Sequence, residues 1–335
     1  MARTLRLGMV GCGAIAQWHK TAIDAVDSVE ISAAIDVDTE RAEAMAKATG
    51  ARPFSCLEDA VAADGCDAVL LMLPHDLHET VCLQALQAGQ HVLLEKPMAP
   101  DTNACDRILA AADKAPGVFM LAENAQYWPE VEIARQAIAE GAIGEIVTAR
   151  VQLFFPPMAQ YYGGENPWRM NLQAAGGGLS IDTGSHYIRP LRMWMGEIEE
   201  VVAAMEHPFP GMEGESLARA LFRFTTGQVA SFDLLLTNGA IAPQDIFRIT
   251  GTEGEITIAA GVTLYNAENR RGQKLREDVP QGYMVSYQGQ IADFANAVLN
   301  GAPPAAAAEF SLGELRTALA MERSTRTRRW EKVWD

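Results

Sequence analysis

Short apolar runs alternate with alanine-rich amphipathic segments in the first third of the chain. The apolar runs lie at residues 5–10, 29–35, 68–72, 91–94 and 118–121. Two of the segments between them, 40–49 and 80–88, have the apolar spacing of a helix. Short strands that alternate with helices of this length are typical of βαβ units, in which helices cover both faces of a parallel sheet. The pattern predicts an N-terminal Rossmann domain with a doubly wound parallel sheet over residues 1–124.

The rhythm of the pattern changes after residue 124. One helical segment, 129–140, ends at Gly141, and runs with period-two alternation follow it. These runs are residues 146–154, 218–224, 229–236 and 247–250. Because glycine and asparagine turns separate several of them, we expect a large, mainly antiparallel sheet with helices on one face. The predicted fold class is therefore α/β, with a C-terminal α+β domain for substrate binding and oligomerisation at residues 125–335.

A glycine-rich loop follows the first apolar run directly. Its sequence, Gly-Cys-Gly-Ala-Ile-Ala from Gly11, matches G-x-G-x-x-A, in which glycines allow a tight turn and close approach of a pyrophosphate. Asp36 ends the second run, where a carboxylate can accept hydrogen bonds from both ribose hydroxyls. A carboxylate there repels a 2′-phosphate, so NAD is favoured over NADP. The candidate cofactor-binding residues of this region are Gly11, Gly13, Ala14, Ile15 and Asp36.

The charge and cysteine content exclude several classes of partner. The 335 residues carry a formal net charge of −16, which repels phosphate backbones and anionic lipids, so we expect neither nucleic acid nor membrane partners. Nothing approaches the length of apolar chain that a membrane span needs. Five cysteines without a C-x-x-C spacing favour reduced thiols and a cytoplasmic location.

Four further motifs follow the glycine loop in a characteristic order. They are Leu73-Pro74-His75-Asp76-Leu77-His78, Glu95-Lys96-Pro97, Trp168-Arg169 ahead of three glycines, and Asp182-x-x-x-His186. With the glycine loop, this order resembles the glucose-fructose oxidoreductase / inositol dehydrogenase / MocA (Gfo/Idh/MocA) family over nearly the whole chain. The resemblance implies an NAD(P)-dependent oxidoreductase acting on CH–OH groups, and a cis bond between Lys96 and Pro97.

Three of the residues suit hydride transfer from an alcohol. His186 has the pKa range of a base that removes the hydroxyl proton, and Asp182, expected one helical turn earlier, can orient it or hold a substrate hydroxyl. Lys96 can stabilise a developing alkoxide. The resemblance implies the same catalytic residues. The remaining candidates contact the cofactor (Leu73, Pro74, His78, Glu95, Lys96 and Asn124) or the substrate (Lys96, Trp168, Arg169, Asp182 and His186).

A metal site is a competing interpretation of His75 and His78. No other His, Cys or Asp cluster has a recognisable ligand spacing, and hydride transfer beside a lysine needs no zinc, so we expect no metal. The resemblance instead places His78 near the cofactor.

The chain departs from the family pattern at three places. Arg189 stands where the family commonly has aspartate, and Gln126-Tyr127 stands where Arg-Phe or Arg-Tyr is common. Pro190 lacks the N–H that would bond to the His186 carbonyl, so we expect a kink there. These departures bear on the substrate and leave the cofactor prediction unchanged.

The leading functional hypothesis is an NAD-dependent dehydrogenase that oxidises a secondary hydroxyl of a sugar, cyclitol or related polyol. Arg169 together with Arg189 suggests an alternative, a ring substrate that bears a carboxylate, such as a dihydrodiol acid or a sugar acid. Two others are a non-catalytic nucleotide-sensing regulator and a hydrolase that uses bound NAD transiently. Because a sheet with helices on one side only leaves its other face apolar and in need of cover, we also expect a homodimer or homotetramer through the C-terminal sheet.

Overall fold

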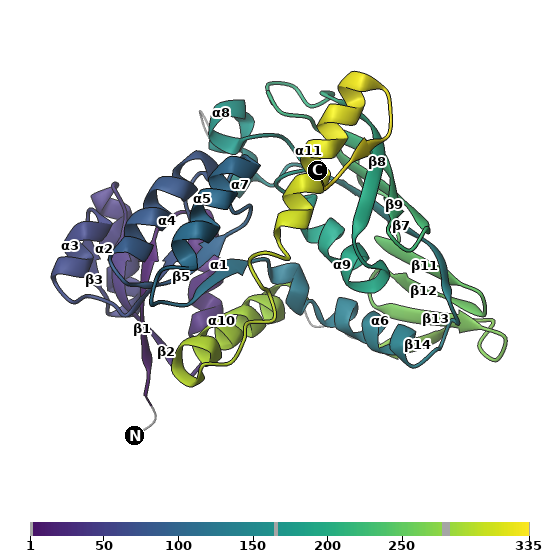
Figure 1. Cartoon of the computed structure of the whole chain (residues 1–335). Helices are drawn as coiled ribbons and strands as arrows, with labels where there is room; N and C mark the ends of the chain where they lie inside the picture. The colour runs from purple at the N-terminus through teal and green to yellow at the C-terminus, as the bar shows by residue number, and fades with distance from the viewer. Residues whose placement is uncertain (1–2, 164–166, 277–281, 335) are drawn as a thin grey trace. The chain divides into compact units, whose positions relative to one another are not determined.

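The computed structural model describes residues 3–163, 167–276 and 282–334. The chain divides into two compact units (Figure 1). The first comprises Met1–Asn124 and Tyr283–Leu312, and the second comprises Ala125–Gly282 and Gly313–Asp335. In the described part of the chain, no helix is long and apolar enough to cross a membrane.

The first unit is built on a six-stranded parallel sheet in the order β3-β2-β1-β4-β5-β6. Its strands are β1 (Leu5–Val10), β2 (Val29–Ile35), β3 (Arg52–Phe54), β4 (Ala68–Leu71), β5 (His91–Glu95) and β6 (Phe119–Ala122). Its helices are α1 (Ala14–Ile23), α2 (Thr39–Thr49), α3 (Leu57–Ala62), α4 (His78–Gln87), α5 (Thr102–Ala112) and α10 (Gly282–Asn300). All four residues of β4 are buried, as expected for a strand covered on both faces. The strand order reverses between β1 and β4, which is where doubly wound sheets bind ligands.

Helix α10 returns from the far end of the sequence to complete this unit. Tyr283 packs edge-on against the Trp18 ring of α1 at 5.4 Å between centroids, and Tyr287 packs against His19 at 4.7 Å. The predicted C-terminal domain, 125–335, differs from the structure here, because residues 283–312 belong to the first unit. Aromatic contacts with α1 draw the segment there, and helical periodicity alone does not reveal them.

The second unit contains a nine-stranded sheet in the order β14-β13-β12-β11-β7-β10-β9-β8-β15. Its strands are β7 (Ile146–Phe155), β8 (Ile198–Glu206), β9 (Leu217–Phe224), β10 (Val229–Leu236), β11 (Phe247–Gly251), β12 (Gly254–Ile258), β13 (Val262–Asn266), β14 (Gln273–Arg276) and β15 (Glu331–Lys332). Its helices are α6 (Pro129–Ala139), α7 (Ala159–Tyr162), α8 (Leu172–Ala175), α9 (Ser185–Met195) and α11 (Leu312–Thr327). Strands β7 and β10 pair in parallel and the other neighbours are antiparallel, which confirms the predicted class.

The two faces of this sheet differ in chemistry. On one face, Phe247 of β11 stacks with Tyr187 and meets Trp194 edge-on, so α9 covers an aromatic core. The other face carries cross-strand ion pairs, among them Arg219 with Asp233 at 3.0 Å. It is therefore more polar than the sequence pattern led us to expect.

Candidate active site

The glycine loop after β1 has the shape that a pyrophosphate requires. Gly11 has a φ of +90°, and a Cβ there would lie 2.2 Å from the Met72 carbonyl oxygen. Gly13 starts α1, and, its chain neighbours apart, no described atom lies within 4 Å of the point where its Cβ would be. No described side chain caps this end of α1, so its first N–H groups stay available to an anion. Ala14 and Ile15 form the first turn of α1, and the loop fits the diphosphate of NAD.

Asp36 fixes the backbone of the loop. Its Oδ2 accepts a hydrogen bond from the Cys12 N–H at 2.7 Å, and its Oδ1 accepts one from the Asp38 N–H at 2.9 Å. Each carboxylate oxygen has a second lone pair, so the predicted ribose contact remains compatible with these bonds. The sequence predicts the ribose contact and misses this structural role.

His78 joins two loops at the carboxyl edge of the parallel sheet. It opens α4 and is fully buried, with Nδ1 2.8 Å from the Pro97 carbonyl oxygen and Nε2 3.0 Å from the Leu73 carbonyl oxygen. Burial lowers its pKa, although both carbonyls oppose the shift. A neutral imidazole has one N–H, so it donates to one of these oxygens at a time. Leu73 and Pro74 follow β4, and His78 ties their loop to the Glu-Lys-Pro segment. Within the described residues, no three His, Cys, Asp or Glu side chains are grouped to hold a metal ion.

Glu95 is the last residue of β5 and Lys96 follows it, and the Lys96–Pro97 bond is cis, which confirms the prediction. Glu95 is buried, and its Oε1 lies 2.7 Å from Nε2 of His19. Its Oε2 accepts a hydrogen bond from the Lys96 N–H at 3.1 Å. His19 was missed, because a single histidine within a helix gives no sequence signal of a partner on another strand.

Asn124 lies buried just beyond β6. Its Nδ2 donates to the Ser286 Oγ of α10 at 2.9 Å, whereas its Oδ1 has no hydrogen-bond partner among the described residues. A buried acceptor left open in this way is compatible with a ligand amide.

In the second unit, Arg169 and Asp182 form an ion pair. Arg169 Nε lies 3.0 Å from Asp182 Oδ2, and both side chains are largely buried. The guanidinium lies over the Trp168 ring at 4.2 Å and over the Tyr161 ring at 4.9 Å. Burial, with the charge of Asp182 nearby, raises the pKa of Tyr162. The cluster offers a paired charge inside an aromatic enclosure.

Asp182 does not lie on the helix that carries His186, contrary to the expectation. Helix α9 begins at Ser185, and Asp182 lies in the turn before it, where the Ser185 Oγ donates to the Asp182 carbonyl oxygen at 3.1 Å. His186 is the second residue of α9 and is buried, with its ring centroid 6.0 Å from that of Trp128. The helix continues through Pro190 to Met195.

Glu215 secures the glycine-rich turn that leads to Asp182. Its Oε1 accepts hydrogen bonds from the Ser180 N–H at 2.7 Å and the Ser180 Oγ at 2.5 Å. A Cβ at Gly178 would lie 2.1 Å from the Glu215 carbonyl oxygen, so the two segments meet only because Gly178 lacks a side chain. Burial raises the pKa of Glu215, although the Ser180 hydrogen bonds oppose the shift. Sequence reasoning missed this residue.

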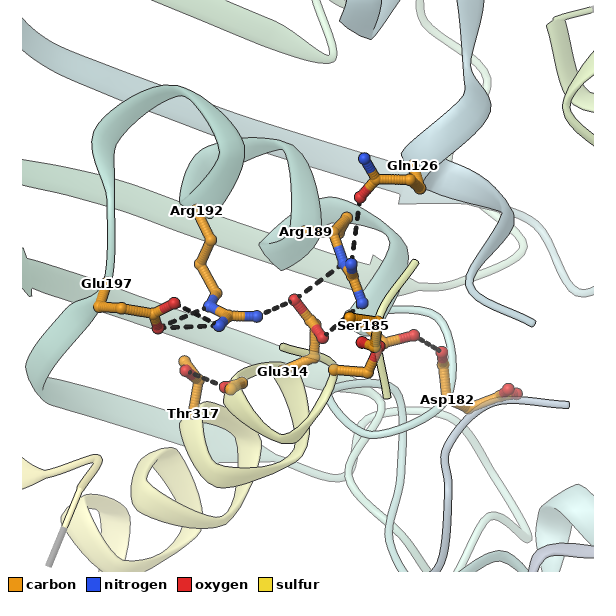
Figure 2. A network of polar contacts seen from close by, with 11 residues as sticks. Gln126, Asp182, Ser185, Arg189, Arg192, Glu197, Glu314 and Thr317 are labelled. Atoms are coloured by element: carbon orange, nitrogen blue, oxygen red, sulfur yellow. Dashed lines mark hydrogen bonds and ion pairs between the residues drawn. The ribbon is translucent and has the colours of Figure 1, made fainter. Parts of the chain in front are cut away.

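Arg189 is fully buried and forms an ion pair with Glu314 (Figure 2). The predicted alternative, in which Arg169 and Arg189 bind a substrate carboxylate, therefore loses one of its two cations. The first unit carries the glycine loop and Lys96, and the second carries Arg169, Asp182 and His186.

Comparison with known proteins places both units in one group of enzymes. A model of the oxidoreductase family with an NAD-binding Rossmann fold matches residues 5–123, and the GFO/IDH/MocA C-terminal domain model matches residues 131–257. The 1,5-anhydro-D-fructose reductase of Ensifer adhaerens is 29% identical over 96% of this chain and 96% of that protein. An inositol 2-dehydrogenase of Corynebacterium glutamicum is 37% identical over 45% of each chain. The WlbA dehydrogenase from Bordetella pertussis, solved in complex with NADH and UDP-GlcNAcA, aligns over 99% of both chains with a TM-score of 0.86 and 26% identity.

Proposed function

Because the chain belongs to the Gfo/Idh/MocA family of NAD-binding oxidoreductases, we propose that it is an NAD-dependent dehydrogenase that oxidises a secondary hydroxyl of a sugar, cyclitol or related polyol. Relatives of this chain are named for sugars and for inositol, which supports the polyol class, and the geometry of the site supports a neutral polyol over an acidic one.

The Arg169–Asp182 ion pair is the observation that carries this proposal. The carboxylate neutralises the guanidinium at 3.0 Å, so the pair offers hydrogen-bond donors and an acceptor without a net charge. Neutral hydroxyls can use both, because a hydroxyl donates and accepts. A substrate carboxylate would have to compete with Asp182 for Arg169, and Arg189 is already paired with Glu314. The site therefore favours a neutral polyol over a sugar acid.

Three residues carry the chemistry in this proposal. His186 removes the proton of the reacting hydroxyl, and Lys96 stabilises the negative charge that develops on that oxygen. Asp182, fixed by Arg169, accepts a hydrogen bond from a substrate hydroxyl. When bound, NAD would supply the acceptor for the hydride that leaves the substrate carbon.

The cofactor contacts form a second part of the proposal. Gly11, Gly13 and the first turn of α1 hold the diphosphate, and Asp36 holds the adenosine ribose. The loops after β4, β5 and β6 line the nicotinamide end, through Leu73, Pro74, Glu95, Lys96 and Asn124. His78 acts through the two loops that it joins.

NADH formation across matched pairs of neutral and acidic sugars tests the proposal. We expect turnover of at least one neutral sugar or inositol, faster than that of the corresponding sugar acid, and loss of turnover in Lys96→Ala. Turnover of acids alone would favour the carboxylate alternative. NAD binding without turnover of any polyol would favour a regulator, and retained NAD without net NADH would favour the hydrolase.

A further inference from the structure

Arg189 lies one helical turn after His186 and has no solvent exposure. Two of its guanidinium nitrogens donate hydrogen bonds, and the third makes only an ion-pair contact. Nη1 donates to Gln126 Oε1 at 3.1 Å, Nη2 donates to Glu314 Oε2 at 3.1 Å, and Nε lies 3.1 Å from Glu314 Oε1 (Figure 2). A planar, forked guanidinium can satisfy such a set, whereas a lysine ammonium cannot. The geometry is therefore specific to arginine.

Arg192, on the same face of α9, completes the charge balance of this network. Its Nη1 contacts Glu314, and its Nε and Nη2 bind the two carboxylate oxygens of Glu197 at 3.0 and 2.6 Å. A Cβ at Gly313 would lie 2.2 Å from the Arg192 Cζ, so the glycine leaves the room that the guanidinium occupies. Two cations and two carboxylates balance. Glu314 also stands in the first turn of α11, where a carboxylate is favoured by the positive end of the helix.

The partners of Arg189 lie where the chain enters the second unit. Gln126 comes two residues after Asn124, the end of the first segment of the first unit. Glu314 comes two residues after Leu312, the end of its second segment. Arg189 thus fastens both entering segments to α9. Gln126 and Arg189 are also two of the three departures from the family pattern, and they contact each other.

Helix α9 lacks a backbone hydrogen bond at His186, one turn before Arg189. Pro190 has no N–H to donate to the His186 carbonyl, so the helix lacks one hydrogen bond of its ladder there. Buried ion pairs add little net stability, and their best-attested use is to fix one arrangement of packed elements.

We propose that Arg189 is a positioning residue for His186. With Glu314 and Gln126 it holds α9 against the two entering segments and so fixes the imidazole for proton removal. This inference rests on the proposed catalytic role of His186.

Arg189→Lys is the first test, because lysine keeps the positive charge but lacks the planar, forked guanidinium. We expect kcat for the polyol to fall by about 10- to 100-fold, the cost typical of a misplaced catalytic group, while the Kd for NAD stays within about twofold. Arg135→Lys is the matched control, since Arg135 binds Glu132 through two nitrogens on the exposed side of α6 in the same unit. Unchanged kcat in Arg189→Lys, or an equal loss in Arg135→Lys, would overturn the proposal.

A charge exchange separates positioning from general destabilisation. Arg189→Asp alone places two carboxylates together, and adding Gln126→Arg restores an ion pair between α9 and the entering segment. We expect the double variant to recover at least part of the kcat that Arg189→Asp loses. Ile256→Ala, a buried change on β12, lowers stability without removing a partner of Arg189 and should leave kcat unchanged. No recovery in a folded double variant, or equal loss in Ile256→Ala, would contradict positioning.

Amide hydrogen exchange keeps the inference independent of the substrate. If the wild type oxidises no polyol, the proposed function fails, and exchange at residues 185–188 decides the role of the network. Faster exchange there in Arg189→Lys, with unchanged exchange in α6, supports the proposal, and unchanged exchange at 185–188 overturns it.

Discussion

Two glycines of one loop should respond in opposite ways to the same methyl group. Gly13→Ala adds a Cβ to open space, since no described atom apart from its chain neighbours lies within 4 Å of it. The backbone there is extended, with φ −79° and ψ −158°, so alanine fits without strain. We expect its stability to stay within about 1 kcal/mol of wild type, because a compatible alanine mainly restricts the unfolded chain. The methyl group would, however, occupy the space that a pyrophosphate needs.

The loss of NAD affinity in Gly13→Ala can be worked out from the contacts at risk. Moving the diphosphate away from α1 removes at least one charge-assisted hydrogen bond, worth about 1.5–3 kcal/mol. That corresponds to a roughly 10- to 150-fold rise in the Kd for NAD.

Gly11→Ala should damage the fold instead. Its φ of +90° costs an alanine about 1–2 kcal/mol. In addition, the Cβ would lie 2.2 Å from the carbonyl oxygen of Met72, the residue that follows β4, and a backbone atom cannot move aside as a flexible side chain can. Separating β1 from β4 there breaks the 2.8 Å bond from the Met72 N–H to the Val10 carbonyl. We expect a total loss of about 2–5 kcal/mol, since overpacking adds about 1–3 kcal/mol to the cost of the backbone conformation.

Urea unfolding and calorimetric NAD titration of both variants check these expectations. Wild-type NAD affinity in Gly13→Ala would refute the diphosphate assignment. Wild-type stability in Gly11→Ala would refute the steric argument.

Four further outcomes are expected. Lys96→Ala and His186→Ala should each lower kcat by about a hundredfold or more while NAD affinity changes little, as rapid-mixing kinetics can show. NAD should bind about tenfold tighter than NADP by calorimetry, and Asp36→Asn should narrow this gap, because a neutral amide no longer repels the 2′-phosphate. Burial lowers the pKa of His91 below its ordinary 6.5, and its Nδ1 accepts the Val118 N–H at 2.8 Å. As the pH falls, the unfolded chain therefore protonates His91 before the folded protein does. The contribution of His91 to stability is complete above about pH 6.5 and is lost as the pH falls below it. His91→Asn, which keeps a hydrogen-bond acceptor, should reduce the fall in melting temperature between about pH 6.5 and 5.5. Light scattering should show a homodimer or homotetramer, and a monomer at micromolar concentration would contradict assembly through the nine-stranded sheet.

Local patterns in the sequence were enough to predict the elements that carry the site. Continuous apolar runs predicted the central strands of the parallel sheet, and period-two runs predicted β7 and β9 to β11, because burial imposes these periods directly. Strand β3 was not predicted, since its three residues, Arg52–Phe54, are exposed or half-buried and contain a proline. The glycine loop and the Asp182-x-x-x-His186 segment were recognisable because their residues are close in sequence.

The residues that support the site were harder to find. Glu314 binds Arg189 from 125 positions away, and His19 meets Glu95 from 76 positions away. Such pairs depend on which helices and strands pack together in the folded protein, and the periodicity of the sequence does not specify this. Arg189 was accordingly interpreted as a ligand for substrate, although burial beside Glu314 makes it part of the protein interior.

The late return of α10 has a consequence for how the chain is made. A ribosome releases all six strands of the parallel sheet before it has synthesised Tyr283, the residue that packs on Trp18. At about 5–20 residues per second, the intervening stretch takes on the order of 10–30 s. During that interval the surface of α1 that α10 will cover has no partner from its own unit. The nascent protein therefore waits for its final sixth with Trp18 uncovered by α10.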